Sequence, residues 1–258
     1  MRNKIIIGID IGGTKTRVGY LGKDNNVKII GHVATSQDPV KAINNIADII
    51  RSAQIPGEIN KIGIVCPGPL NQKTGMILSP PNLPKWDDFP IVEILKKEFG
   101  VDTILENDAN AGALGEAVFG AAQNAHTVLY FSLSTGIGAG IVINKKVHIG
   151  YKGLAGEIWC VPPKLFGANT GERSILDLSS GNGMVELAKE QISKGVETII
   201  RKDQPTSYEI FDAFHKGDKL AIQLIENARE ILNGTMVFSS CLLAPDVIVL
   251  GGGLTNDL

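Results

Sequence analysis

The sequence Gly8-Ile9-Asp10-Ile11-Gly12-Gly13-Thr14-Lys15-Thr16 joins two β-branched apolar runs through a pair of glycines. This pattern predicts strands over residues 4–10 and 16–21 with a tight turn between them. The backbone N–H groups of such a turn can surround an anion, and a carboxylate beside it can hold the waters of a Mg²⁺ ion. A plain glycine hairpin with a solvated aspartate is the alternative interpretation.

Short apolar strands and amphipathic helices alternate along the chain that follows this turn. Asp38-Pro39 provides a cap and a first-turn proline, so a helix begins there. Further strands are predicted over residues 27–34, 61–66 and 101–105, and further helices over 90–99 and 109–122. This alternation predicts an α/β architecture with two domains flanking a cleft.

The opening pattern recurs after His126. Strands are predicted over 127–133, 137–143 and 147–149, and the first two are joined by the turn Ser134-Thr135-Gly136. Residues 153–178 show no regular pattern. Helices follow over 183–194, 206–217 and 218–243, and a strand over 247–250 leads into Gly251-Gly252-Gly253. We therefore expect one domain over residues 1–106 and a second over 107–258.

The composition excludes several classes of protein. The 258 residues are 43% hydrophobic, and 25 basic against 27 acidic residues give a net charge of −2. A polyanion would find no excess of positive charge, so nucleic acid is not an expected partner. No segment approaches the ~20 apolar residues that span a bilayer. The three cysteines form no C-x-x-C pair and the four histidines have no zinc spacing. A reduced, cytoplasmic protein without a membrane partner is expected.

Asp108 is the candidate general base. It follows Asn107 at the start of a predicted helix, where the cleft between the domains would fall. In phosphoryl transfer one carboxylate accepts the proton of the attacking hydroxyl. The alternative is that Asn107 or Asp108 only caps the helix. Both roles can hold, because a capping residue can also face a cleft.

Eight short segments occur in the order found in sugar kinases of the ROK family, within the actin and hexokinase superfamily, and the chain resembles that family over nearly its whole length. Each segment alone is weak evidence for the family, but the eight segments in this order are specific to it. The segments are Asp10-Ile11-Gly12-Gly13-Thr14-Lys15, Pro67-Gly68-Pro69, Asn82-Leu83-Pro84-Lys85-Trp86, Glu106-Asn107-Asp108-Ala109-Asn110, Ser134-Thr135-Gly136-Ile137-Gly138, Ala155-Gly156-Glu157, Ser180-Gly181 and Leu250-Gly251-Gly252-Gly253-Leu254.

The resemblance implies a fold of two ribonuclease-H-like (actin-like ATPase) domains and an ATP-dependent kinase. Such an enzyme transfers the γ-phosphate of Mg-ATP to a primary hydroxyl of a hexose, with Asp108 as catalytic base and glucose as the first candidate. Asp10 would organise Mg²⁺ through water, and Gly251, Gly252 and Gly253 would approach the adenosine. The phosphate-binding residues would be Gly12, Gly13, Thr14, Lys15, Thr135 and Gly136. The sugar-binding residues would be Gly68, Asn82, Asn107, Asp108 and Glu157.

The chain departs from the glucokinase pattern near the sugar site. Trp159 and Cys160 stand where glucokinase-like members have Gly-His, so a sugar-contacting histidine is missing. The family's zinc cysteines are also missing, and no zinc site is expected. Leu176 stands where a second sugar-binding glutamate is expected, and Glu172 is a possible substitute. Family chains continue past the third glycine into further helix, and this sequence stops at Leu258. Relatives are often dimers, so a homodimer is possible.

Other functions compete with that of a glucokinase-like enzyme. The acceptor could be another hexose, such as fructose or N-acetylmannosamine. A catalytically inactive sugar sensor would retain the sugar fold. A transcription regulator would carry a helix-turn-helix ahead of the phosphate turn, and only nine residues precede Asp10. Phosphotransfer to an acid, as in acetate kinases, leaves the match at Asn82 and Glu157 without an explanation.

Overall fold

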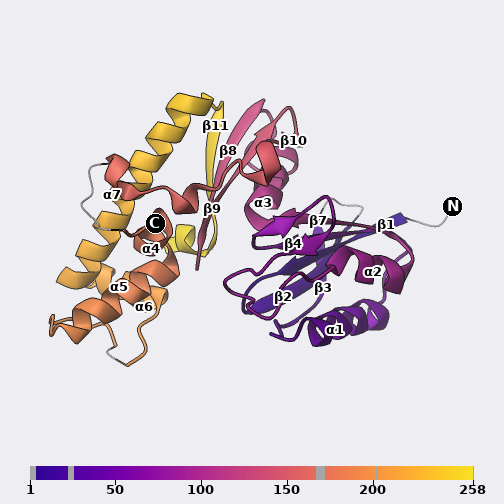
Figure 1. The fold of residues 1–258 in the computed structure, drawn as a ribbon, viewed down its shortest axis with the longest axis horizontal. Coiled ribbons are helices and arrows are strands. Elements are labelled where there is room, and N and C mark those ends of the chain that lie inside the picture. Colours follow the sequence, from indigo (N-terminus) through magenta and orange to yellow (C-terminus); the bar gives the residue numbers. More distant parts are fainter. Residues whose placement is uncertain (1–3, 23–25, 167–171, 202, 258) are drawn as a thin grey trace. The chain divides into compact units, whose positions relative to one another are not determined.

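The structure, a computed structural model, describes residues 4–22, 26–166, 172–201 and 203–257. Contacts within the chain divide it into two compact units, Met1–Ala111 and Gly112–Leu258 (Figure 1). The division therefore falls five residues later than the boundary expected from the sequence, and Asn107 and Asp108 lie in the first unit rather than the second. Within the described ranges, no helix combines the length and apolarity needed to cross a membrane.

The first unit contains a five-stranded sheet of β1 (Lys4–Ile11), β2 (Lys15–Leu21), β3 (Val27–Ala34), β4 (Glu58–Cys66) and β7 (Asp102–Asn107). Its strand order is β3-β2-β1-β4-β7. The first three strands form an antiparallel meander, and β4 and β7 add parallel strands on the other side of β1. The carboxyl ends of β1, β4 and β7 consequently meet at one edge of the sheet.

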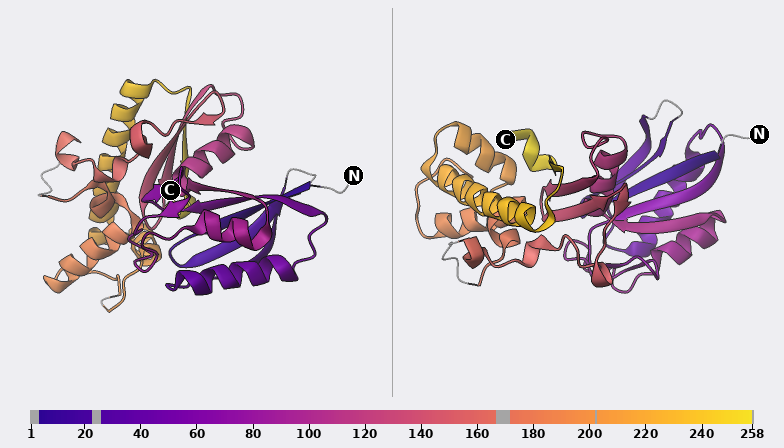
Figure 2. Two further views of the ribbon diagram at one scale, coloured as in Figure 1. Left: turned by 45° about the vertical axis from the view of Figure 1, so that its right-hand side comes forward. Right: turned by 90° about the horizontal axis from the view of Figure 1, so that it is seen from above.

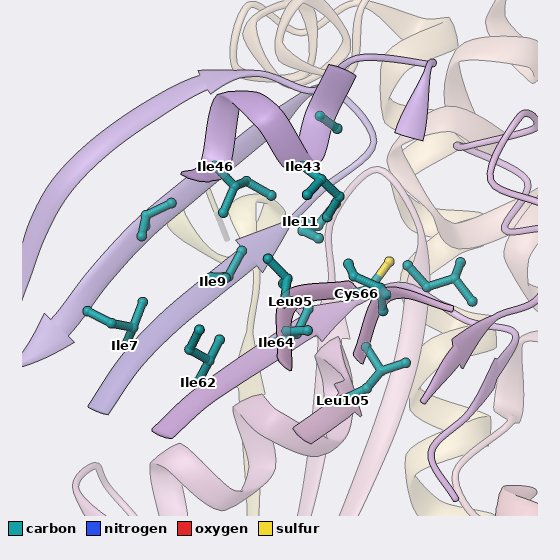
Figure 3. Packing of buried hydrophobic residues seen from close by; sticks show 14 of the residues in the cluster. Ile7, Ile9, Ile11, Ile43, Ile46, Ile62, Ile64, Cys66, Leu95 and Leu105 are labelled. Carbon is teal, nitrogen blue, oxygen red and sulfur yellow. The ribbon is translucent and has the colours of Figure 1, made fainter. Parts of the chain in front are cut away.

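Isoleucines at every second position of the parallel strands form the core of the first unit. Ile7 and Ile9 of β1 and Ile64 of β4 are almost completely buried on one face of the sheet. Ile46 of α1 (Pro39–Ser52) and Leu95 of α2 (Ile91–Phe99) pack against that face (Figure 3). Burial of each such side chain contributes about 1.5–3 kcal/mol. Successive side chains of a strand point to opposite faces of the sheet, so isoleucines at every second position define the face that the helices cover.

Local capping sets the ends of these two helices. The carboxylate of Asp38 accepts a hydrogen bond from the N–H of Val40 at 2.9 Å, and Pro39 occupies the first helical position. Gly100 ends α2 in the left-handed conformation, with φ of 66°. A residue without a Cβ adopts this conformation at little cost. The predicted start at residues 38–39 and the predicted stop at Gly100 are confirmed.

The second unit contains a four-stranded sheet of β8 (Thr127–Leu133), β9 (Ile137–Ile143), β10 (Lys146–Val147) and β11 (Val247–Gly251). The strand order is β10-β9-β8-β11, with β8, β9 and β10 antiparallel and β11 parallel to β8. This is the arrangement of β3-β2-β1-β4 in the first unit. The repeated strand pattern predicted from the sequence is thus a repeated topology.

Helices cover both faces of the second sheet. The small residues Ala113 and Ala117 of α3 (Asp108–Val118) pack with Val128 on one face. Ile175 of α4 (Ile175–Ser179) and Ile231 of α7 (Lys219–Leu243) pack on the other face. A strand covered on both faces is expected to be mainly apolar, and β8 has Val128, Leu129, Phe131 and Leu133 buried.

Three helices of the second unit share a further apolar cluster. Figure 2 shows the ribbons of these helices in orange to yellow. They are α5 (Gly181–Ser193), α6 (Ser207–His215) and α7. The predicted capping box starts α6, since Thr206 and Glu209 each accept from the backbone N–H of the other. The short elements between the larger ones are β5 (Leu70–Asn71), β6 (Met76–Ile77), η1 (Tyr151–Gly153), η2 (Ile158–Cys160), η3 (Pro163–Phe166) and η4 (Gly253–Asp257).

Two elements differ from the sequence-based expectation. Helix α3 ends at Val118 rather than near residue 122, because the Glu116 carboxylate accepts the N–H of Ala121 at 2.9 Å and closes the chain into a turn. The segment 153–178, expected to be irregular, contains α4. A capping box between Ser174 and Asp177 starts this five-residue helix.

Candidate active site

The turn after β1 is held by a network around Thr35. The N–H of Gly12 donates to the carbonyl of Lys15 at 3.0 Å and closes the turn. The hydroxyl of Thr35 donates to the carbonyl of Gly12 at 2.7 Å, and the N–H of Thr35 donates to the carbonyl of Thr14 at 3.0 Å. Thr14 and Lys15 are exposed. Two carbonyls of the turn therefore accept hydrogen bonds from Thr35, the residue after β3, while Thr14 and Lys15 face solvent.

Asp10 precedes this turn on β1 and lies opposite Arg17 of β2. The guanidinium of Arg17 donates to Asp10 Oδ2 at 3.1 Å, and about half of each side chain is exposed. Such a surface pair contributes about 0–1 kcal/mol to stability. Asp10 is thus an accessible carboxylate at the carboxyl end of β1.

Gly13 brings the turn against Asn82, a residue far from it in the sequence. A Cβ placed on Gly13 would lie 2.8 Å from Asn82 Cβ, which is closer than real Cβ atoms approach. The carbonyl of Asn82 also accepts from the Gln37 amide at 3.4 Å. The structure therefore places a residue predicted to bind sugar in contact with the predicted phosphate turn.

Asn107 ends β7 and caps α3. Its Oδ1 accepts the N–H groups of Ala109 at 2.9 Å and Asn110 at 3.3 Å. Its Nδ2 lies on the side of Gly68, 3.5 Å from the position that a Cβ on Gly68 would take. Asp108 is the first residue of α3 and is exposed. Asn107 therefore caps α3, and the next residue, Asp108, is exposed.

Glu106 supports this segment from the preceding position on β7. Its Oε1 accepts from the N–H of Asn107 at 2.8 Å, from Asn110 Nδ2 at 3.0 Å and from Gln72 Nε2 at 3.3 Å. Three donors on one carboxylate oxygen fix the backbone next to Asp108. Sequence reasoning did not assign this network, because its members come together only in the folded unit.

Cys66, at the end of β4, interacts electrostatically with both candidate carboxylates, Asp10 and Asp108. Burial raises the pKa of its thiol, and the negative charges of Asp108 and Asp10 raise it further. The thiol is therefore uncharged. Asp10 pairs with Val65 of β4, and Cys66 pairs with Asn107 of β7, which Asp108 follows directly. Asp10 and Asp108 therefore lie at the same carboxyl-terminal edge of the sheet, where α/β proteins bind ligands.

In the second unit, the turn after β8 pairs with the start of α5. The N–H of Gly181 donates to the carbonyl of Ser134 at 2.8 Å, and the N–H of Asn182 donates to the carbonyl of Thr135 at 3.1 Å. The Thr135 side chain is exposed, and Gly136 is partly buried. The segments containing Ser134 and Ser180, both singled out in the sequence, are thus held together.

The glycines at the end of β11 pack against β8, the strand that leads into this turn. Gly252 has φ of 104°, and a Cβ on it would lie 2.2 Å from the carbonyl oxygen of Leu133. A Cβ on Gly251 would lie 2.3 Å from the Tyr130 hydroxyl. No larger residue fits at either position. Gly251 and Gly252 therefore lie against the strand that ends at the Thr135 turn.

Glu157 lies on a short segment attached to β9. Gly156 before it has φ of 85°, and a Cβ there would lie 2.3 Å from the Ala139 carbonyl oxygen. The indole Nε1 of Trp159 donates to Glu157 Oε2. The Cys160 thiol donates to the Glu157 carbonyl at 3.2 Å. Trp159 and Cys160, noted in the sequence as departures, thus contact the candidate sugar residue.

Leu176, at the position expected for a second glutamate, packs against the apolar cluster of the second sheet. Glu172 is exposed. In the part of the chain that the structure describes, no three His, Cys, Asp or Glu side chains are grouped as metal ligands. Residues 167–171, part of the segment inspected for zinc cysteines, lie outside the described residues.

Known proteins similar to this chain were compared with it. The sequence profile of the ROK family matches residues 6–257. N-acetyl-D-glucosamine kinase of Haemophilus influenzae is 32% identical, over 96% of this chain and 84% of that protein. Glucokinase of Thermotoga maritima is 28% identical, over 97% of this chain and 82% of that protein. The structure of a ROK family glucokinase from Streptomyces griseus, in complex with glucose and AMPPNP, is 27% identical with a TM-score of 0.80, covering 98% of this chain and 84% of that chain.

The two α/β units, each with a meander, a parallel fourth strand and a glycine turn, define a protein with the actin-like fold of sugar kinases. The predicted fold class is confirmed. The chain belongs to the ROK family, as the ordered motifs indicated.

Proposed function

We propose that this protein is an ATP-dependent kinase that transfers the γ-phosphate of Mg-ATP to a primary hydroxyl of a hexose. The observation that carries the proposal is the meeting of Asp10, Asp108 and the glycine turn at one edge of the first sheet. The kinase relatives and the bound glucose and AMPPNP of the Streptomyces griseus protein support it.

Asp108 is the proposed general base. As the exposed first residue of α3, its carboxylate can accept the proton of the sugar hydroxyl while the hydroxyl oxygen attacks the γ-phosphorus. The bond from the γ-phosphorus to the bridging oxygen of ATP breaks, and ADP leaves. Glu106 and Asn107 hold the backbone beside the base, so its position does not depend on the ligand.

The phosphates are assigned to two glycine turns. In the first unit, Gly12 closes the turn through its N–H, while Gly13 and Thr14 offer backbone N–H groups, Thr14 a hydroxyl and Lys15 an ammonium. In the second unit, Thr135 and Gly136 offer a hydroxyl and backbone. The adenosine is assigned to Gly251–Gly253, where Gly251 and Gly252 hold this backbone close to Tyr130 and Leu133 and a Cβ on Gly253 would enter open space. In phosphoryl transfer the protein contributes mainly such positioning and charge neutralisation.

A magnesium ion fits the chemistry of Asp10. Mg²⁺ prefers oxygen ligands, retains several waters and binds proteins through one or two carboxylates. Asp10 supplies one accessible carboxylate next to the phosphate turn. When bound, the ion neutralises the charge of the β- and γ-phosphates.

The sugar is assigned to Gly68, Asn82, Asn107, Asp108 and Glu157. Amide and carboxylate groups of fixed geometry distinguish hydroxyl epimers, since a mismatched epimer leaves buried polar groups unpaired. Glucose is the first candidate acceptor. Other hexoses, such as fructose and N-acetylmannosamine, are the alternatives, and the Haemophilus influenzae relative adds N-acetylglucosamine to the set to be tested.

The experiment is an assay of ADP release with Mg-ATP against these hexoses, together with mannose and allose. We expect one sugar to give clear turnover. Hexose binding without any ADP release, measured by calorimetry, would instead support a sugar sensor and remove the kinase assignment.

The role of Asp108 is tested in the same assay. Asp108→Asn should lower kcat by about 10²-fold or more, with hexose binding largely kept. Asp102→Asn is the matched control, because Asp102 is an exposed carboxylate at the start of β7, the strand that leads to Asp108, and it pairs with Lys61 away from the site. Near-normal turnover of the Asp108 variant would exclude Asp108 as the base.

A further inference from the structure

A hydrogen bond within one turn defines the orientation of the Glu157 side chain. The indole Nε1 of Trp159 donates to Glu157 Oε2, and both residues belong to the turn that forms η2. Trp159 is 44% exposed. Its N–H is therefore bound to the carboxylate, while part of its ring remains accessible beside that carboxylate.

The turn that carries this pair is anchored to the second sheet. Gly156 packs directly on the backbone of Ala139 in β9, with no room for a Cβ. The N–H of Ile158 donates to the Gly156 carbonyl at 2.7 Å, and the Ile158 side chain packs on the apolar cluster of the sheet. Trp159 and Glu157 are thus held on a fixed support.

The two groups match the two surfaces of a hexose. A carboxylate has about four lone-pair sites, so Glu157 can still accept hydroxyl donors while it accepts the indole N–H. An aromatic ring offers a flat apolar surface at a low entropic cost. A pyranose presents hydroxyls at its edge and C–H groups on its face, so adjacent carboxylate and indole can bind both.

We propose that Trp159 is a specificity-determining residue of the sugar site: its N–H orients Glu157, and its ring contacts the C–H face of the bound hexose. This inference rests on the proposed function, in which Glu157 binds the sugar. An axial hydroxyl would interrupt the C–H face toward the ring. The site therefore favours all-equatorial hexoses, such as glucose and its 2-acetamido derivative, over epimers with an axial hydroxyl on that face.

Tryptophan fluorescence tests the contact without requiring turnover. The chain has two tryptophans. Trp86 is completely buried, with its indole donating to the Ser36 carbonyl at 3.1 Å. Acrylamide should therefore quench Trp159 selectively. We expect a bound hexose to reduce this quenching, and an unchanged quenching constant at a saturating concentration of the turned-over hexose would overturn the proposal.

Two substitutions separate the N–H from the ring. Trp159→Phe keeps a ring and loses the donor, and should raise the KM for the hexose on the order of tenfold. Trp159→Leu also loses the ring, and should raise it several-fold more. The KM for ATP and the kcat should stay within about twofold in both, because Glu157 orients the sugar rather than reacting with it.

Tyr151→Leu is the matched control, because Tyr151 is an aromatic residue of the neighbouring η1 that is 80% exposed and contacts Lys152. It should leave the KM for the hexose unchanged.

The outcomes separate this inference from the kinase assignment. Turnover by the wild type with an unchanged hexose KM in both Trp159 variants overturns the inference and leaves the kinase intact. Protection of Trp159 by a hexose without ADP release supports the inference and removes the kinase. If no hexose protects Trp159 and none is turned over, both the inference and the kinase assignment are excluded.

Discussion

Two substitutions of Asn107 should separate its capping of α3 from its contact with a sugar. Oδ1 accepts two backbone N–H groups at the start of the helix, at 2.9 and 3.3 Å. Nδ2 lies on the side of Gly68 and is the proposed donor to a sugar hydroxyl. Alanine removes both functions. Aspartate keeps the oxygen that accepts the two capping N–H groups and removes the donor.

The expected magnitudes follow from these contacts. Loss of an N-cap side chain costs about 1 kcal/mol of the free energy of unfolding, which is about 2–4 °C in Tm for a chain of this size. Aspartate is as good a cap as asparagine, so the Asp variant should stay within about 0.5 kcal/mol of wild type. Both variants lose one hydrogen bond to the hexose, and its KM should rise about tenfold in each.

Urea unfolding followed by circular dichroism and the ADP-release assay measure the two effects. Asn71→Ala is a matched control, because Asn71 Oδ1 accepts the N–H of Thr74 at 3.2 Å in a turn outside the site. It should leave the hexose KM unchanged. Equal stability of Asn107→Ala and Asn107→Asp would refute the capping account. A wild-type hexose KM in Asn107→Asp would refute the binding account.

Two further predictions concern the second unit. Gly252→Ala should raise the KM for ATP by tenfold or more and cost about 1–3 kcal/mol of stability. The reason is that φ is 104° and the new Cβ would lie 2.2 Å from the Leu133 carbonyl oxygen. A variant with the same ATP kinetics as the wild type would contradict the adenosine assignment. Burial raises the pKa of Asp218, but hydrogen bonds from the backbone N–H groups of Ala221 and Ile199 outweigh it and lower the pKa below the ordinary value. Its ionised form therefore contributes stability above the unfolded pKa of about 4, which is lost as pH falls through the folded pKa. The destabilisation by Asp218→Asn, measured by urea unfolding, should be present at pH 7 and shrink below about pH 4. If the stability difference between variant and wild type does not change with pH, ionisation of Asp218 is excluded as its cause.

The sequence predicted most of the fold because its signals are local. The strands 27–34, 127–133 and 137–143 were predicted with their observed bounds, since apolar alternation ends at turn residues in each. Capping chemistry likewise predicted the starts of α1 and α6. The five-residue α4 was missed, because one turn of helix is too short to show a period.

The sequence predicted the candidate site residues one by one, but their arrangement needed the structure. The contact between Gly13 and Asn82 joins segments almost seventy residues apart, and no spacing indicates it. The hydrogen bond from Trp159 to Glu157 joins residues two apart in an irregular turn, which has no sequence signature. The role of Glu106 as the acceptor for three donors depends on Gln72, which comes from a different loop.

The repeated strand order has a consequence for the course of folding. In the first sheet Ile7 pairs with Ile62, which lies 55 residues further along the chain, whereas in the second Leu129 pairs with Ile248, 119 residues further on. Doubling the closed loop adds about 0.6 kcal/mol of entropic cost, and more distant pairings slow folding. During synthesis the first sheet is also complete once residue 107 has emerged, whereas the second waits for residue 251. The amino-terminal sheet should therefore form first, and the carboxyl-terminal sheet should set the rate at which the whole chain reaches its native state.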